Sequence, residues 1–386
     1  MILVPAKGDK IFLCYRRIMQ TTAYKLLNII KNQFMPGKKF FVITSLLLSV
    51  FLFQNCSKKD AGSIDPGQQA TVLNLPQTPY NYSDIPFPAH ITAALAANDN
   101  TPVNNAITND GATLGRVLFY DMNLSFNRTI NCASCHKQEQ GFTDEARLSK
   151  GFEGGLTTRN SMSLLNVRFY TSGKMFWDER AGTLEEQVLQ PVQNHIEMGM
   201  SVDSVLARLN RLTYYPPLFT SAFGSADIDT EKIARALSQF IRSIVTYQAR
   251  YDRVKQGLEV FTAAEREGEQ LFLNATGPGG PGAPTCATCH TPPMFLNSDG
   301  PPFTLPDNED LGILNEGRFK AGSLRNITAT NNLFHNGSIS NVETMLNSQI
   351  PAHGVAPPDR AKILAFLQTL TDNTVTTDIR FSSPFR

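Results

Sequence analysis

The sequence predicts a mainly α-helical fold with two similar halves and long irregular loops. Three observations support this prediction. Apolar residues recur at helical spacing in several segments, whereas the strict alternation expected of strands is weak throughout. Stretches rich in glycine and proline, such as 275–284 and 301–310, separate these segments. A short pattern of two cysteines and a histidine occurs twice, which indicates an internal repeat.

Length and composition limit the class of protein. The chain has 386 residues, enough for two or three domains, and 41% of them are apolar, enough for a proper core. The formal net charge is +1, so the chain lacks the basic excess that nucleic-acid-binding proteins show. We therefore expect no nucleic-acid partner.

The N-terminal part, residues 1–56, has the layout of a secretory signal. Two lysines precede an apolar run from Phe40 to Phe53, which is short for a stable membrane span. Cys56 follows after two further residues and suggests a bacterial lipoprotein that is cleaved before this residue and lipidated on it. An uncleaved N-terminal anchor is the alternative. Either way, we expect the protein on the periplasmic side of a membrane.

Residues 57–88 are rich in Ser, Gly, Pro, Gln and Asn and predict a flexible tether. The folded part is expected to begin near Pro88. Upstream of the signal nothing resembles a folded unit, so Met35 is the expected start, with Met1 and Met19 as alternatives.

Three helices stand out in the folded part. The first, at 229–250, begins at Asp229 or Thr230. The apolar residues on its buried face are Ile233, Leu237, Phe240, Ile241 and Ile244. The second, at 262–273, opens with threonine and glutamate at capping-box spacing. The third, at 359–370, follows a pair of prolines that we take as a stop.

Four of the six cysteines belong to two Cys-x-x-Cys-His motifs. The motif residues are Cys132, Cys135 and His136 in the first, and Cys286, Cys289 and His290 in the second. Each motif follows a Gly-x-x-Leu-Phe segment, at 115–119 and at 268–272. We interpret this as two copies of one supersecondary unit.

Three kinds of site use such residues. A structural zinc usually draws on two cysteine pairs at moderate spacing, but here the pairs lie far apart and each has its own histidine. A redox dithiol is expected in a βαβ context, which is missing from the pattern. Haem c fits, because the thiols bind the porphyrin covalently and the histidine binds its iron. The sequence therefore predicts two haems, with His136 and His290 as proximal ligands.

With these motifs in place, the chain resembles the bacterial di-haem cytochrome c peroxidases and the MauG family from about Leu114 to Leu370. The matching stretches, in family order, are LGRVLFYDMNLS, CASCH, RNSMSLLNV, FWDERAGTLEEQ, HIEMGM, CATCH, FKAGSLRNITAT and FHNG. The resemblance implies two cytochrome c-like haem domains, a peroxidatic one at 89–252 and an electron-transfer one at 253–386. It also implies one Ca²⁺ between them.

The resemblance assigns roles to individual residues. Those it implies for catalysis are Glu197 as distal acid–base residue, Gln187 as a second distal polar residue and Trp177 between the haems. Those it implies for calcium are Asn160, Thr330 and the backbone of Asn332, with His335 just after. A carboxylate above the iron can move the proton that peroxide cleavage needs. From the residues alone, Glu197 as a helix cap or ion-pair partner of Arg180, and Trp177 as a core anchor, stay open.

The sequence departs from the family in two places. No histidine occurs between 137 and 159, where many members carry a far-side ligand of the first haem, and Phe152 stands near that position. We therefore expect an open or water-bound first iron, as in MauG-type members. The family's methionine or tyrosine ligand of the second haem falls on Gln349. Our order of candidates is Met345, Gln349 and His353, with Met345 as a mere core residue left open.

These observations predict an enzyme, a di-haem cytochrome c peroxidase. It would reduce hydrogen peroxide to water with electrons from a small protein of the cytochrome c or cupredoxin type. One alternative is a MauG-like oxidase that acts on a partner protein. Another is a non-enzymatic di-haem electron carrier, which would not need a distal acid such as Glu197. The sequence leaves open the physiological donor, the haem potentials and whether the protein forms a homodimer.

Overall fold

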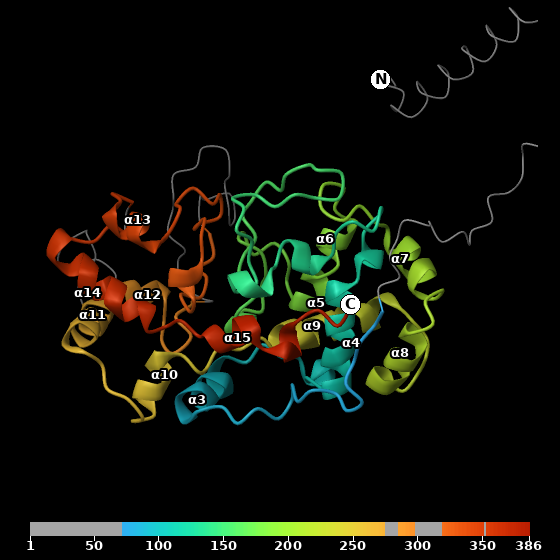
Figure 1. The fold of residues 1–386 in the computed structure, drawn as a ribbon, viewed down its shortest axis with the longest axis horizontal. Coiled ribbons are helices and arrows are strands. Elements are labelled where there is room, and N and C mark those ends of the chain that lie inside the picture. Colours follow the sequence, from blue (N-terminus) through green and yellow to red (C-terminus); the bar gives the residue numbers. More distant parts are fainter. Residues whose placement is uncertain (1–71, 275–284, 298–318, 351–352) are drawn as a thin grey trace, which may run out of the picture. The chain divides into compact units, whose positions relative to one another are not determined.

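The computed structural model describes residues 72–274, 285–297, 319–350 and 353–386. Within them the protein is mainly helical, as predicted, and extended backbone pairs only in isolated bridges (Figure 1). The α-helices are α3 (Ala89–Asn98), α4 (Asn109–Tyr120), α5 (Leu184–Gln187), α6 (Gln190–Gln193), α7 (Val202–Leu209), α8 (Tyr215–Phe223), α9 (Thr230–Arg242), α10 (Arg250–Lys255), α11 (Ala263–Asn274), α12 (Cys286–Cys289), α13 (Val342–Asn347), α14 (Pro357–Gln368) and α15 (Asn373–Thr377). Short 3₁₀ helices lie at Val103–Asn105, Met122–Leu124, Cys132–Ser134, Gln138–Gln140, Val167–Phe169, Ile327–Ala329 and Ile379–Phe381.

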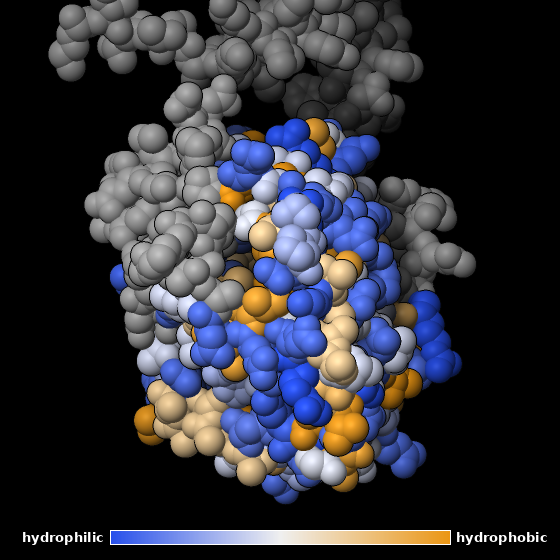
Figure 2. Space-filling model, turned by 90° about the vertical axis from the view of Figure 1, so that its left-hand side faces the viewer, coloured by the Kyte–Doolittle hydropathy of each residue, from blue (hydrophilic) through white to orange (hydrophobic). Residues whose placement is uncertain are grey.

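The predicted signal, with Met35 and Cys56, lies outside the described residues. None of the described helices is long and apolar enough to span a bilayer. Figure 2 shows the side of the molecule that carries α11, α13 and α14. Hydrophilic residues predominate on the described part of this face, and apolar residues form only small patches, because the apolar sides of these helices are packed inside.

Two helix pairs, α4 with α9 and α11 with α14, form the framework of the fold. Both pairs cross at a glycine. A Cβ atom added to Gly115 would lie 2.0 Å from the carbonyl oxygen of Ala236, and one added to Gly268 would lie 2.0 Å from that of Lys362. The backbones therefore meet directly in both pairs. We call residues 109–247 the first repeat and residues 263–372 the second.

The repetition extends to the loops that follow the motifs. Asn166 and Asn326 both adopt left-handed backbone conformations, with φ of 64° and 63°. The backbone N–H of Asn166 donates to the carbonyl of Ile244 at 3.0 Å, and the backbone N–H of Asn326 donates to the carbonyl of Leu370 at 3.2 Å. The two acceptors occupy equivalent positions in the two repeats. The two copies inferred from the cysteine motifs thus fold alike.

Helix α9 confirms the first predicted helix but is shorter. Asp229 caps it by accepting a hydrogen bond from the amide of Lys232 at 2.8 Å. The helix ends at Arg242, although the prediction extended to 250. Beyond that point the backbone bonds to Asn166, which accepts from the amide of Thr246 at 3.0 Å and so draws the chain out of the helix.

The other two predicted helices are also present. In α11, the amide of Thr262 donates to Glu265 at 2.7 Å and the amide of Glu265 donates back to Thr262 at 3.3 Å, which is the predicted capping box. Helix α14 begins at Pro357, so the prolines open this helix rather than precede it. Proline has no amide hydrogen to donate, and the first turn of a helix has no acceptor for one.

The apolar cores of the two repeats divide mainly near residue 250, but Met294, Leu296 and the last residues belong to the first core. Phe381 packs against Phe142 and Phe240 in the first core, with ring centroids 6.4 Å and 6.3 Å apart. The segment 373–386 therefore contributes to the first core, whereas the predicted boundary assigned it to the second domain.

The part of the predicted tether that the structure describes, residues 72–88, packs against the folded part. Tyr82 is 3% exposed, and its hydroxyl donates to the carbonyl of Arg380 at 2.6 Å. Leu73 pairs with Phe385 in an antiparallel bridge. Ordered contacts thus begin upstream of the predicted start near Pro88.

Candidate functional site

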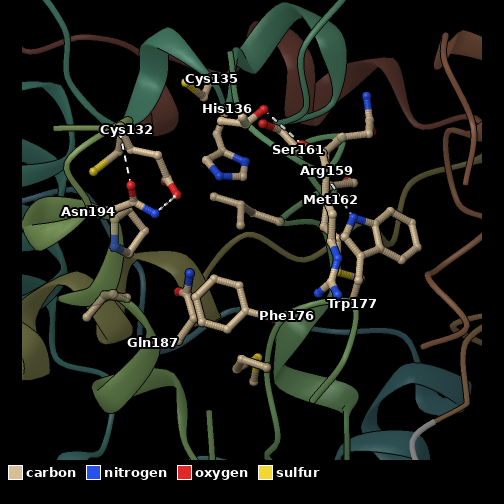
Figure 3. Close-up of a pocket in the computed structure, with 18 of the residues that line it drawn as sticks. Cys132, Cys135, His136, Arg159, Ser161, Met162, Phe176, Trp177, Gln187 and Asn194 are labelled. Atoms are coloured by element: carbon tan, nitrogen blue, oxygen red, sulfur yellow. Dashed lines mark hydrogen bonds between the residues drawn. The ribbon is translucent and has the colours of Figure 1, made fainter. Parts of the chain in front are cut away.

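The first motif lies at the wall of a cavity of about 800 Å³, the first cavity (Figure 3). The turn that presents the motif is fixed by Asn131. Its Oδ1 accepts a hydrogen bond from the amide of Ser134 at 3.0 Å, and its Nδ2 donates to the carbonyl of Tyr120 at 2.6 Å. Helix α4 therefore positions the motif through the carbonyl group of its last residue, Tyr120.

His136 is held as a neutral imidazole with one nitrogen free to bind a metal. Its Nδ1 lies 3.0 Å from the carbonyl oxygen of Phe142. A carbonyl only accepts, so Nδ1 carries the hydrogen and Nε2 keeps its lone pair. Burial lowers the pKa of His136, which favours the neutral form. Figure 3 shows the ring pointing into the first cavity.

The second motif repeats this arrangement at a second cavity of about 190 Å³. The Nδ1 of His290 donates to the carbonyl of Gly322 at 3.1 Å and lies 3.3 Å from that of Phe295. Burial, together with the nearby His353, lowers the pKa of His290 to about 4. This imidazole is also neutral, and its Nε2 keeps its lone pair.

The side chains present fit haem c at both motifs. All four motif thiols are free of disulfides. Burial raises the pKa of Cys132 to about 12 and that of Cys135 to about 11. The first cavity falls within the roughly 300–1,000 Å³ of cofactor sites, whereas the second is smaller. The motifs line separate cavities, which argues against a zinc site shared between them.

Glu197 lies on the wall of the first cavity, in the loop after α6. Asn194 orients it: the Nδ2 of Asn194 donates to the Glu197 carboxylate at 2.9 Å, while its Oδ1 accepts from the amide of Ile196 at 2.8 Å. Burial raises the pKa of Glu197, and the charge of Arg180 opposes this. Arg180 itself is ion-paired with Asp178 at 2.7 Å. Glu197 is thus a partly buried carboxylate that faces the cavity.

A third cavity, of about 410 Å³, adjoins the first one. Both are lined by Phe176, Arg180 and Glu197. The third cavity is also lined by Gln193 and His195, which are exposed at the surface. Glu197 therefore lies where the first cavity meets the third one, near exposed residues.

Gln187 and Trp177 also face the first cavity (Figure 3), and their catalytic roles stay predictions. Gln187 ends α5, a short helix capped by Thr183. Trp177 lines both the first and the second cavity. Its indole N–H donates to the carbonyl of Asn160 at 2.8 Å, and its own carbonyl accepts from the amide of Lys320 at 2.8 Å. The tryptophan is thus fixed between the two motifs.

Met345 and His353 line the second cavity, whereas Gln349 is exposed and is not among the described residues that line it. Met345 occupies the position in α13 that Gln187 occupies in α5, one turn after the capping residue. The His353 ring packs edge-on against Phe334 at 5.1 Å. Of the three candidates, Met345 and His353 thus line the second cavity and Gln349 does not, and the second ligand of this iron stays a prediction.

The residues predicted to bind calcium lie together on the second cavity. These residues are Asn160, Thr330 and Asn332. The Nδ2 of Asn160 donates to the carbonyl of Arg147 at 3.0 Å, and that of Asn332 donates to the carbonyl of Glu145 at 2.7 Å. The Asn332 amide thus links the second repeat to the first, whereas the bond between Asn160 and Arg147 lies within the first repeat. Calcium binding stays a prediction.

Phe152, which stands near the family's far-side histidine, is held away from the first cavity. Its amide donates to the carbonyl of Glu197 at 3.0 Å, and its ring packs on Phe126 at 5.7 Å. A Cβ atom added to Gly199 would lie 2.4 Å from the Phe152 ring, so this packing needs glycine there. Phe152 is not one of the described residues that line the first cavity.

Three residues at the site were missed by the sequence reasoning: Asn194, Tyr170 and Lys320. Each is a single polar or aromatic residue in a loop, without a periodic or spacing signal. Asn194 lies three residues before Glu197, and asparagine side chains often bond to the backbone of a following turn, so this spacing could have indicated the contact. For the other two, the contacts are formed between distant segments.

Known proteins resemble this chain over most of its folded part. A family model described as di-haem cytochrome c peroxidase matches residues 109–259. The methylamine utilization protein MauG of Methylophilus methylotrophus is 32% identical over 255 residues, which are 64% of this chain and 73% of that protein. The cytochrome c551 peroxidase of Nitrosomonas europaea is 31% identical over 293 residues, 72% of this chain and 85% of that protein. A crystal structure of a MauG-like protein associated with microbial copper homeostasis has a TM-score of 0.68 at 29% identity and covers 78% of this chain and 99% of that one.

Proposed function

Because this chain belongs to the family of di-haem cytochrome c peroxidases and MauG proteins, we propose that it is a cytochrome c peroxidase. It reduces hydrogen peroxide to water with two electrons from a small donor protein. The observation that carries this proposal is Glu197, a partly buried carboxylate where the first cavity meets the third one. A protein that only carries electrons has no need of an acid–base group there.

The family implies two haem c groups, and the motif residues would hold them. Cys132 and Cys135 would form thioether bonds at the first cavity, and His136 would bind the iron through Nε2. When bound, the haem iron would supply the redox centre at which peroxide is reduced. At the second cavity His290 would have the same role, and Met345 is the residue that we prefer as a second ligand.

Glu197 would move the proton that peroxide cleavage requires. Its carboxylate accepts the proton from one peroxide oxygen and returns it to the departing oxygen, which leaves as water. Asn194 holds the carboxylate in place by the 2.9 Å hydrogen bond. The Gln187 amide, on the same cavity, offers a donor that can orient peroxide.

Trp177 would provide the route for electrons between the two sites, since its side chain lines both cavities. The hydrogen bond from its indole to Asn160 keeps the ring in one orientation. A fixed aromatic ring shortens the gap that an electron must cross.

A MauG-like oxidase that acts on a partner protein is the second candidate. Two observations favour it: residues 137–159 contain no histidine, with Phe152 packed away from the first cavity, and the chain is similar to MauG proteins. Such an oxidase would turn over slowly with peroxide and a small cytochrome. Rapid steady-state turnover with the cytochrome therefore favours the peroxidase.

The remaining proposals concern location and assembly. We propose a periplasmic lipoprotein with its lipid on Cys56, and one Ca²⁺ bound by Asn160, Thr330 and Asn332. The mass of the mature N-terminal residue tests the lipid, and metal analysis after chelation tests the Ca²⁺. Sedimentation of the holoprotein tests whether it forms a homodimer.

The decisive experiment compares wild-type holoprotein with Glu197→Gln in hydrogen peroxide and a reduced small cytochrome. We expect a rate loss of about 10²-fold or more with both haems retained. Glu153→Gln is the matched control, because Glu153 is an exposed carboxylate in a neighbouring loop. Equal turnover of wild type and Glu197→Gln would refute the catalytic assignment.

A further inference from the structure

A buried ammonium group lies at the wall between the two haem cavities. Lys320 lines both cavities and is 4% exposed. Its backbone amide donates to the carbonyl of Trp177, and its Nζ donates to the carbonyl of Lys174. Burying a cation is costly even when it is hydrogen-bonded. Burial lowers the pKa of Lys320 to about 8, so the ammonium form still predominates at neutral pH.

The ammonium lies over an aromatic ring. The Nζ of Lys320 is 3.6 Å from the ring centroid of Tyr170. Tyr170 is 3% exposed and lines the first cavity, so it is a second oxidisable aromatic residue there, beside Trp177. A cation at the face of a ring is attracted to the neutral, electron-rich ring. A ring that is losing an electron would instead repel it.

The surroundings of Trp177 have the opposite effect. Its indole N–H donates to the carbonyl oxygen of Asn160 at 2.8 Å. A hydrogen bond to an acceptor stabilises positive charge on the donor. The two aromatic residues on the first cavity therefore differ: the contacts of Trp177 favour loss of an electron, and those of Tyr170 oppose it.

We propose that Lys320 determines which aromatic residue takes part in electron transfer, by keeping Tyr170 reduced so that electrons pass through Trp177. This inference rests on the proposed peroxidase function. In the side reaction that Lys320 suppresses, the Tyr170 phenol gives one electron to the oxidised first site and its proton to water. A neutral tyrosyl radical remains, and one oxidising equivalent is lost to the protein.

The test measures tyrosyl radical by electron paramagnetic resonance in holoprotein that is frozen soon after peroxide is added. Lys320→Met should give about tenfold more radical than wild type, the change expected from loss of a desolvated cation–π contact. Lys320→Arg keeps the charge and should resemble wild type. In Lys320→Met/Tyr170→Phe the signal should disappear. Lys320→Gln serves as a second neutral variant if Lys320→Met does not fold.

Two outcomes would overturn the inference: a haem-replete neutral variant with no more tyrosyl radical than wild type, or Lys320→Arg with as much radical as Lys320→Met. Photochemical oxidation by a ruthenium complex needs no peroxide and should give the same ranking. If peroxide leaves the haem spectrum of every variant unchanged, the peroxidase proposal fails. The photochemical ranking then still decides the role of Lys320.

Discussion

At the scale of single residues, the first cavity combines a neutral imidazole with a carboxylate that is harder to ionise than usual. The carbonyl of Phe142 fixes the tautomer of His136, and Asn194 fixes the orientation of Glu197. Burial acts on both groups in the same sense, because it disfavours their charged forms. The first cavity therefore presents two groups suited to different tasks: the His136 imidazole can bind a metal, and the Glu197 carboxylate can transfer a proton.

The rate of the first reaction with peroxide should rise with pH through the pKa of Glu197. The carboxylate form is the one that accepts the proton, and burial places its pKa above the ordinary glutamate value of about 4.3. Stopped-flow measurement across pH checks this in wild type. The same rise in Glu197→Gln would assign the step to another group.

Replacing Trp177 by Phe should separate the two half-reactions. The ring stays on both cavities, but the hydrogen bond to Asn160 is lost. We expect turnover with the reduced cytochrome to fall on the order of tenfold, equivalent to about 1.4 kcal/mol of activation free energy. The single-turnover reaction with peroxide should keep its rate. If both rates fall together, Trp177 serves as a core anchor.

At the scale of elements, each motif depends on a helix pair that crosses at close backbone contact. The glycines at the two crossings leave no room for a side chain, because the partner carbonyl would lie 2.0 Å from a Cβ atom. In the sequence, each motif is preceded by the first helix of its pair, α4 or α11. The crossing therefore sets where the thiols and the imidazole stand.

The change Gly268→Ala should destabilise the second repeat, because the added methyl group forces α11 away from α14. Overpacking of this kind costs about 1–3 kcal/mol. Denaturant unfolding of the holoprotein, followed by haem absorbance, measures it. Gly155→Ala is the control, since its Cβ atom would meet only Ile196 at 3.5 Å. Equal unfolding midpoints for the two variants would contradict the packing argument.

At the scale of the whole molecule, a buried cluster around an ion pair ties helix α3 to the second repeat. Arg325 binds both carboxylate oxygens of Asp252 at 2.7 Å and 2.8 Å, and His90 of α3 contacts the same carboxylate at 2.9 Å. The side chains of Asp252 and Arg325 are fully buried, and Arg325 also lines the second cavity. This cluster therefore connects α3, α10 and the second site.

Asp252→Asn should cost about 3–5 kcal/mol, because it leaves the Arg325 charge buried and unpaired. Burial alone would raise the pKa of Asp252, but the hydrogen bonds and charge of Arg325 outweigh it and the pKa is lowered. Its stabilisation is thus complete above the unfolded pKa of about 3.9 and is lost as the pH falls through the lower folded value. Unfolding free energies of wild type and variant should differ most near pH 7 and converge in acid. A constant difference would contradict this.

The sequence by itself determined the features that depend on neighbouring residues. The two motifs, the capping box at Thr262 and the internal repeat are all local patterns, and the structure shows each where it was predicted. Glu197, Gln187 and Trp177 came from the family resemblance, and all three line the first cavity. The end of α9 could not be predicted locally, because it depends on hydrogen bonds to Asn166 in a distant loop.

Only the tertiary structure decided how distant segments meet. It placed Trp177 on both cavities and Lys320 over Tyr170, and it showed that neither Phe152 nor Gln349 is among the described residues that line the cavities. It also showed that the segment 373–386 packs in the core of the first repeat. The physical reason is that burial and contact are properties of the packed chain: spacing along the sequence fixes which groups share a turn, whereas packing between repeats fixes which groups share a cavity.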